Sequence, residues 1–203
     1  GASHVFLGEP EAWRRWPERE ALTKIQNASL VPLDLTDVSS IEKLAAEIGG
    51  KVDILVNTAS FVRPGGIMGN DINFARDAFE DGVNSAAAFV NILSAHALMP
   101  DPNYSAFGAS QAAARSISQS LRAEFRASGL RMMNVYIGAI EGDPWFQTLP
   151  SPKVTPAAIA RGIVHGLIEG LEEVTCGDIA KDIYARWQKD AGLLEREITG
   201  GGS

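Results

Sequence analysis

Residues Val52–Thr58 read VDILVNT, a short run that is apolar at most positions and ends in polar side chains. Five comparable runs lie along the chain, at His4–Gly8, Leu30–Leu35, Ala87–Ser94, Met132–Ile137 and Val174–Cys176. Near-continuous apolar character is typical of strands that are buried on both faces of a parallel sheet. The six runs therefore predict an interior parallel sheet in an α/β fold.

Helical patterns alternate with these runs. Two serines precede Ile41–Ile48 and two glycines follow it, which is typical of a capped helix. Thr155 and Pro156 predict the start of another helix that runs to about Glu173. Further helical patterns cover Asn70–Glu80, Ser105–Ser128 and an amphipathic tail, Asp178–Ile198. The length of 203 residues and the absence of an internal repeat or linker pattern predict a single domain over residues 1–203.

The composition is that of an ordinary soluble globular domain. The chain has 203 residues, a net charge of −7 and 45% hydrophobic residues. No apolar run approaches the ~18 residues of a membrane span, and no basic cluster offsets the acidic balance, so we expect neither membrane nor nucleic acid as a partner. The single Cys176 excludes an intramolecular disulfide, and no histidines have metal-ligand spacing. We therefore expect a cytoplasmic, metal-free protein.

Several short motifs follow one another in a characteristic order. Leu33–Asp37 reads LDLTD, Asn57–Ser60 reads NTAS, and Ser94 precedes the stretch YSAFGASQAA at Tyr104–Ala113. In this order and spacing, the chain from His4 to about Glu197 resembles a short-chain dehydrogenase/reductase. The resemblance implies an α/β fold of that family's type, a Rossmann-like doubly wound parallel sheet, and an oxidoreductase lineage.

The resemblance also identifies the positions that carry the family's chemistry. The family uses a tyrosine as acid or base, a lysine four residues later that lowers its pKa, and a serine thirteen residues before the tyrosine. These positions hold Phe107, Gln111 and Ser94 in this chain. Phenylalanine has no ionisable proton and glutamine has no charge. The serine is retained, and we expect the chain to be catalytically inactive in hydride transfer.

The cofactor positions are retained only in part. The resemblance implies that Asp34 touches the adenine ring, that Asn57 supports the sheet and the cofactor, and that Gly138 belongs to the loop at the nicotinamide. The family's NNAG turn reads NTAS here, and Ile137 replaces the proline before Gly138. We expect no bound cofactor, or NAD or NADP if the family function is retained. Glu9 is either a ribose ligand or a solvated loop charge.

Two segments of the family's fold have no counterpart in the sequence. In the strand order 3-2-1-4-5-6, the chain starts at what matches the second strand. Near Glu80–Gly82, about five residues replace a long helix, too few for a crossover of roughly a dozen. We expect omitted segments before Gly1 and near Glu80–Gly82, so the runs His4–Gly8 and Leu30–Leu35 should have no partner at their inner edge.

These observations favour a catalytically inactive subunit or scaffold. It would form a homo- or hetero-oligomer, pairing with an active paralogue of the family through helices 105–128 and 156–173. Apolar residues on both helices motivate this hypothesis: Ile117, Leu121, Phe125, Ile159, Ile163 and Leu167.

Three alternatives stay open. One is an active NAD(P)-dependent oxidoreductase of altered mechanism, which uses Ser94 with Tyr104 or water. Another is a non-redox enzyme or small-ligand binder that uses Ser94 and Gln111. The last is a hydrolytic pair of Ser94 with His96. Alternation at the end of the strand argues against this pair, because we expect it to point the two side chains apart.

Overall fold

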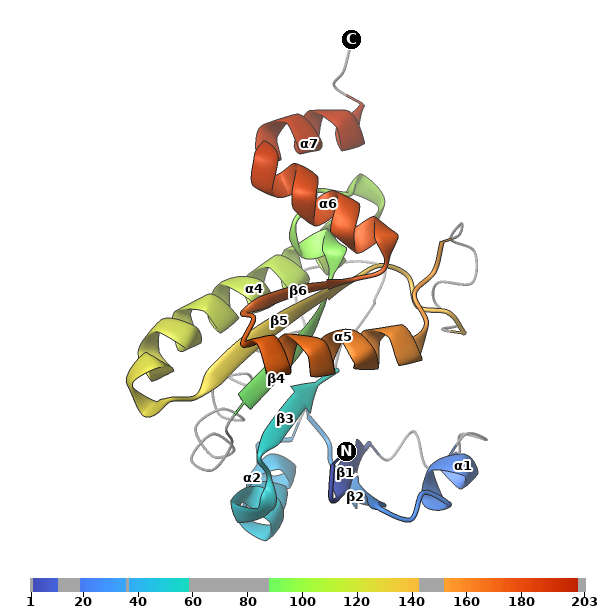
Figure 1. Ribbon diagram of the computed structural model, residues 1–203, viewed down its shortest axis with the longest axis vertical. Helices are drawn as coiled ribbons and strands as arrows, with labels where there is room; N and C mark the ends of the chain where they lie inside the picture. The colour runs from blue at the N-terminus through green and yellow to red at the C-terminus, as the bar shows by residue number, and fades with distance from the viewer. Residues whose placement is uncertain (1, 11–18, 36, 59–87, 143–151, 201–203) are drawn as a thin grey trace. The chain divides into compact units, whose positions relative to one another are not determined.

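The computed structural model describes residues 2–10, 19–35, 37–58, 88–142 and 152–200. Its helices, strands and short 3-10 turns (η) alternate along the chain (Figure 1) in the order β1 (Val5–Glu9), α1 (Arg19–Thr23), β2 (Ala28–Pro32), α2 (Val38–Ile48), η2 (Gly49–Lys51), β3 (Ile54–Asn57), β4 (Ala88–Ser94), η3 (Ala95–Ala97), η4 (Pro102–Tyr104), α4 (Ser105–Glu124), η5 (Phe125–Ser128), β5 (Arg131–Ile137), α5 (Pro156–Glu169), β6 (Glu173–Cys176), α6 (Asp178–Lys189) and α7 (Ala191–Thr199).

The chain forms two compact units, each with a parallel sheet. In the first unit, β1 pairs with β2, from Val5 opposite Ala28 to Glu9 opposite Pro32. The second unit holds a four-stranded sheet in the order β3-β4-β5-β6, parallel throughout. Among the described residues, β1 pairs with β2 alone and β3 with β4 alone. The omitted segments and the single domain stay predictions, and residues 80–82 lie outside the described residues.

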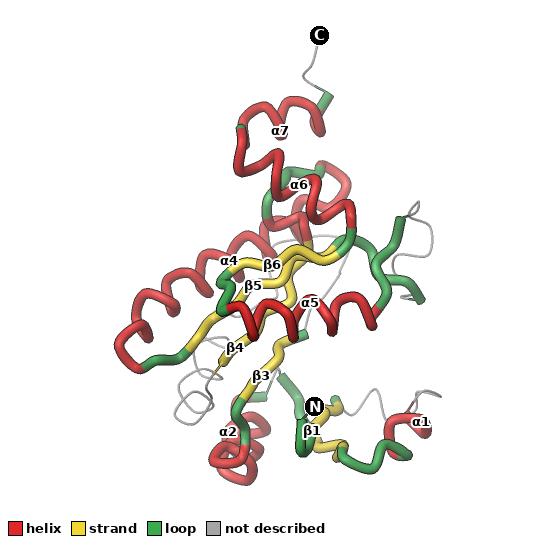
Figure 2. Tube along the Cα trace, viewed as in Figure 1, coloured by secondary structure: helices red, strands yellow, loops and turns green. Residues whose placement is uncertain are grey.

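The pleat of β5 builds a separate core on each face of the four-stranded sheet. Met133, Val135 and Ile137 point to one face, where they pack with residues of α5. Tyr136 points to the other face and packs with residues of α6 and α7. Figure 2 shows α5 on one face of this sheet and α4 on the other. Helices on both faces of a parallel sheet confirm the predicted Rossmann-like, doubly wound class.

Some element boundaries differ from those that the sequence predicts. The strand predicted at Leu30–Leu35 is β2, which ends at Pro32 because its partner β1 ends opposite it at Glu9. The helix predicted to reach Glu173 ends at Glu169, because Gly170 adopts a left-handed φ of 67°. The tail divides into α6 and α7 at Asp190, whose side chain caps α7 by accepting from the Leu193 N–H. The helix predicted at Asn70–Glu80 lies outside the described residues.

Within the residues that the structure describes, no helix is both long enough and apolar enough to cross a lipid bilayer.

Two glycines allow α5 to lie directly against the sheet. A Cβ atom built on Gly166 would lie 2.6 Å from Val174 Cγ2, and one on Gly162 would lie 2.4 Å from Cys176 Sγ. Both distances are shorter than real Cβ contacts, so any larger residue forces α5 away from β6. The separation of α5 from the sheet therefore depends on glycine at these two positions.

We predict that Gly166→Ala destabilises the protein by about 1–3 kcal/mol, because the added methyl group overpacks a closed helix–sheet contact. Chemical denaturation measures the change in the free energy of unfolding. Gly192→Ala in α7 is the matched control, since a Cβ there finds its nearest neighbours at 3.5 Å and alanine favours the helix by up to about 1 kcal/mol. Equal effects of the two substitutions would contradict this account of the packing.

Candidate functional site

The site is built where β4 ends. The chain leaves the strand at Ser94 and turns at once into η3, and the Ser94 hydroxyl accepts a hydrogen bond from the His96 N–H at 3.2 Å. This turn folds the imidazole back, so that His96 Nδ1 lies 2.9 Å from Ser94 Oγ. The expectation that these side chains point apart is wrong. His96 lies in the 3-10 turn and not on β4, so strand alternation does not apply to it, and the Ser94 cap brings the two side chains together.

Asp101 continues this chain of contacts. Its Oδ2 lies 3.3 Å from His96 Nε2, while its Oδ1 accepts the Asn103 N–H at 2.9 Å and caps η4. Because the second contact fixes the carboxylate, the first one orients the imidazole. Ser94, His96 and Asp101, here called the polar triad, form one continuous set of hydrogen-bonding side chains.

The first turns of α4 complete the surroundings of the triad. Phe107 and Gln111 are both buried, each with 6% of its surface exposed. The Phe107 ring lies edge-on to the imidazole at 5.6 Å between centroids, and the Tyr104 ring does so at 5.4 Å. The Gln111 Oε1 atom accepts the Ser94 backbone N–H at 2.8 Å.

The structure thus brings together the three predicted residues Ser94, Phe107 and Gln111. It adds His96 and Asp101 beside them. Sequence reasoning considered His96 and passed over Asp101. The available signal was Asp101 followed by Pro102, because an acidic N-cap before proline is typical of a helical turn that holds its carboxylate in place.

Burial favours the neutral form of the His96 imidazole. Burial lowers its pKa below the ordinary value of about 6.5, and the Asp101 carboxylate only partly offsets this effect. The side chain is 15% exposed, which is consistent with a desolvated ring. At neutral pH, one ring nitrogen therefore carries a proton and the other can accept one.

We predict that Asp101→Asn lowers the His96 pKa further, because it removes the negative charge that favours the imidazolium. An NMR titration of the ring protons measures the pKa in both proteins. An unchanged or higher pKa in the variant would refute the assigned contact.

The same shift has a consequence for stability. As the pH falls below about 6.5, the unfolded chain binds the His96 proton before the folded chain does. The stabilising contribution of the neutral ring is therefore present above that pH and is lost as the pH falls through the folded pKa. His96→Gln should remove this part of the pH dependence of the free energy of unfolding.

The residues assigned to cofactor binding are divided between the two units. Asp34 is exposed after β2, and its N–H donates to Ser40 Oγ at 3.0 Å. Asn57 Nδ2 donates to Asn91 Oδ1 at 3.2 Å, which joins β3 to β4. Gly138 follows β5 and lines a cavity. Asp34 belongs to the first unit, whereas Asn57 and Gly138 belong to the second.

Glu9 is not the solvated loop charge that was one of its two interpretations. Its exposed fraction is 6%, and its carboxylate forms an ion pair with the guanidinium of Arg19. An ion pair accounts for the burial, because a carboxylate rarely leaves water without a partner. Ser60, the last residue of the NTAS turn, lies outside the described residues.

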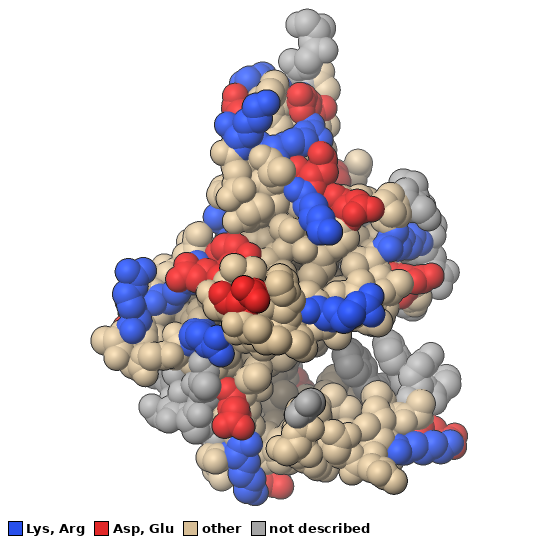
Figure 3. Space-filling model, viewed as in Figure 1, with Lys and Arg blue, Asp and Glu red and all other residues tan. Residues whose placement is uncertain are grey.

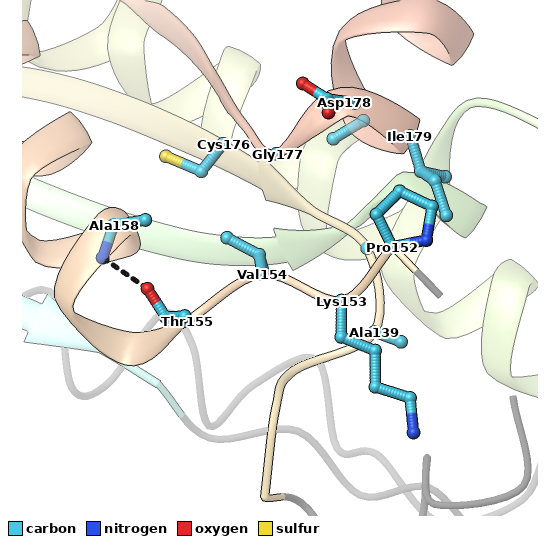
Figure 4. A pocket seen from close by; sticks show the side chains of 12 residues that line it. Ala139, Pro152, Lys153, Val154, Thr155, Ala158, Cys176, Gly177, Asp178 and Ile179 are labelled. Atoms are coloured by element: carbon cyan, nitrogen blue, oxygen red, sulfur yellow. Dashed lines mark hydrogen bonds between the residues drawn. The ribbon is translucent and has the colours of Figure 1, made fainter. Parts of the chain in front are cut away.

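A cavity of about 180 Å³ opens at the carboxyl ends of β5 and β6. Figure 4 shows its lining, in which Thr155 caps α5 by accepting the Ala158 N–H at 3.1 Å, and the side chains of Lys153 and Asp178 extend in opposite directions from the wall. The rest of the lining is mainly apolar: Gly138, Ala139, Pro152, Val154, Ala158, Cys176, Gly177, Ile179 and Ala180. Burial raises the pKa of the Cys176 thiol, which stays protonated and is not a nucleophile at neutral pH.

No cluster of three or more histidine, cysteine, aspartate or glutamate side chains that could hold a metal ion occurs among the described residues.

Comparisons with known proteins point to one family. Residues 73–150 match the family model of the short chain dehydrogenases. A short-chain dehydrogenase/reductase of Pestalotiopsis microspora is 27% identical over 129 residues, which are 64% of this chain and 48% of that protein. The match therefore spans about half the length of this relative.

Solved structures resemble the whole chain. A short-chain dehydrogenase from Burkholderia cenocepacia in complex with NADP has a TM-score of 0.82 at 21% identity, covering 98% of this chain and 87% of that one. One from Streptomyces avermitilis has a TM-score of 0.73 at 18% identity, covering 100% and 99%. One from Sphingobium yanoikuyae in complex with NADPH has a TM-score of 0.70 at 19% identity, covering 98% and 87%.

These likenesses establish the fold as that of the short-chain dehydrogenases. The family model and the relative from Pestalotiopsis each match part of the chain, and both matches are to short-chain dehydrogenases.

Proposed function

We propose that this chain is a short-chain dehydrogenase/reductase without the family's tyrosine-dependent hydride transfer, which works as a subunit or scaffold. The observation that carries the proposal is the hydrogen bond from the Ser94 backbone N–H to Gln111 Oε1 at 2.8 Å. The residue at the position of the activating lysine is a neutral amide held in an internal contact. The neighbouring Phe107, at the position of the tyrosine, is buried and has no proton to give.

The proton chemistry of the family requires both missing groups. A phenol has an ordinary pKa of about 10, and a nearby cation brings it toward neutral pH. Phe107 lacks the phenol and Gln111 lacks the cation, so neither the proton donor nor the group that lowers its pKa is present at these positions. Tyr104 is not a replacement, because its ring packs edge-on against His96 and Gly108 stands four residues after it.

The cofactor positions support the same proposal. The relatives from Burkholderia cenocepacia and Sphingobium yanoikuyae hold NADP or NADPH. In this chain the Asn57 amide bonds to Asn91 and thereby joins β3 to β4, and the Asp34 backbone N–H bonds to the Ser40 hydroxyl. The NTAS turn and Ile137 before Gly138 depart from the family's pattern at the cofactor, and we infer that no dinucleotide is tightly bound.

We predict that titration of the isolated chain with NADH or NADPH gives no micromolar binding, measured by fluorescence or calorimetry, and that no carbonyl substrate is reduced. An active short-chain dehydrogenase in the same buffer is the control. The double variant Phe107→Tyr/Gln111→Lys tests whether these two positions alone account for the missing carbonyl reduction. We expect it to stay inactive, because cofactor binding is also reduced. Micromolar binding together with carbonyl reduction by the unaltered chain would refute the proposal.

The exposed side of α5 is the surface that we propose for subunit association. Val164 is 56% exposed and Ile168 is 75% exposed, one helical turn apart on the same side. Figure 3 shows uncharged atoms between charged groups over this face. Exposed apolar residues that share one helix face are typical of a protein interface.

The interface residues named from the sequence need correction. Ile163 and Leu167 pack against the core beneath α5, and Ile159 is buried there. On the other helix, Leu121 is also buried. These residues stabilise the subunit itself, and Val164 and Ile168 replace them in the proposed contact with a second chain of the same fold.

We predict that Ile168→Asp weakens association at least about tenfold, because it places a charge in a desolvated contact. Light scattering after size-exclusion chromatography, with the chain alone and with a co-purified partner, measures the assembly. Leu193→Asp on α7 is the matched control, since it charges another exposed apolar side chain, 41% exposed, away from α5. The proposed surface is wrong if both substitutions act alike.

A further inference from the structure

The hydrogen bonds of the polar triad are consistent with only one arrangement of protons around a neutral ring. Asp101 accepts from His96 Nε2–H at 3.3 Å, which leaves Nδ1 without a proton. Nδ1 then accepts the Ser94 hydroxyl proton at 2.9 Å, and Ser94 Oγ in turn accepts the His96 backbone N–H at 3.2 Å. An unprotonated imidazole nitrogen thus faces the serine hydroxyl, and the Asp101 carboxylate holds the ring in this orientation.

The triad lies where parallel α/β proteins bind small molecules. Ser94 is opposite Ile137 in the sheet, and Ile137 is opposite Cys176, so the carboxyl ends of β4, β5 and β6 share one edge. The 180 Å³ cavity opens at the ends of β5 and β6 along this edge. Its mainly apolar lining suits a short hydrocarbon chain better than a charged group.

We propose that Ser94 is a nucleophile that accepts an acyl group from esters of short carboxylic acids, with His96 as its base and Asp101 as a positioning residue. This activity is independent of the subunit role and of any nucleotide. It assigns chemistry to His96 and Asp101, which hydride transfer by this fold does not use.

The step balances within these residues. The Ser94 O–H bond breaks, its proton moves to His96 Nδ1, and Oγ forms a bond to the acyl carbon. The bond from that carbon to the alcohol oxygen then breaks, and the imidazolium returns its proton to the departing oxygen. Water attacks the acyl-serine in the second half, with His96 again taking and returning a proton. Carboxylic acid and alcohol leave, Ser94 is restored, and no oxidant or reductant is consumed.

A purely structural role makes a different prediction. Ser94 and Asp101 both cap 3-10 turns, and capping by itself requires no contact of either side chain with the imidazole. Asp101→Asn separates the two roles, because asparagine caps as well as aspartate but has no charge to hold the imidazole. If Ser94 only caps the turn, its hydroxyl reacts with an acyl donor no faster than an ordinary serine hydroxyl in every variant.

The test is covalent labelling of the full chain with a fluorophosphonate, followed by intact mass measurement and peptide mapping. We expect one adduct on Ser94, formed as Oγ displaces fluoride and His96 takes the proton. Ser94→Ala should abolish the adduct. His96→Gln should slow labelling at least about a hundredfold, and Asp101→Asn at least about tenfold, with the rate still rising with pH as the imidazole loses its proton.

Ser110→Ala is the matched control, because Ser110 lies nearby on α4 and its hydroxyl donates to the Phe107 carbonyl at 2.8 Å without touching the triad. It should label at the rate of the unaltered chain, and thermal unfolding verifies that each variant is folded. Hydrolysis of p-nitrophenyl acetate and butyrate, with an initial burst, should follow the same order of variants. An unaltered chain that stays unlabelled, or labelling that is equal in His96→Gln, would overturn the proposal.

Discussion

The parallel, in-register pairing of β4, β5 and β6 is the constraint on which the site depends. Ser94 lies opposite Ile137, and Ile137 lies opposite Cys176. The three strands therefore end at one edge of the sheet, and the segments that follow them begin in the same region. The turns that follow differ in length and sequence, yet each begins from a backbone position that the sheet has fixed. The polar triad and the cavity both lie at this edge.

Gln111 has a structural role at the end of β4. Its Oε1 atom accepts the Ser94 backbone N–H and ties α4 to the end of β4. Phe107, one turn earlier, packs against the His96 ring. These two side chains of α4 thus support the backbone of Ser94 and the imidazole of His96.

Helix α5 has two apolar sides with different roles. Gly162 and Gly166 bring its inner side against the sheet, where side chains such as Ile159 fill the core. Its outer side carries Val164 and Ile168, which no described residue buries. Helical periodicity alone marks the helix as apolar on both sides, and only the position of the sheet separates core from surface.

The sequence by itself determined the alternation of strands and helices, and it predicted a resemblance in which Phe107 and Gln111 take the positions of a tyrosine and a lysine. These follow from local patterns of apolar residues and from residue identity at a given spacing. Only the tertiary structure decided that His96 meets Ser94 and Asp101. That meeting depends on where β4 ends and on two capped 3-10 turns that fold the chain back, and neither the periodicity nor the spacing of the residues encodes such a reversal.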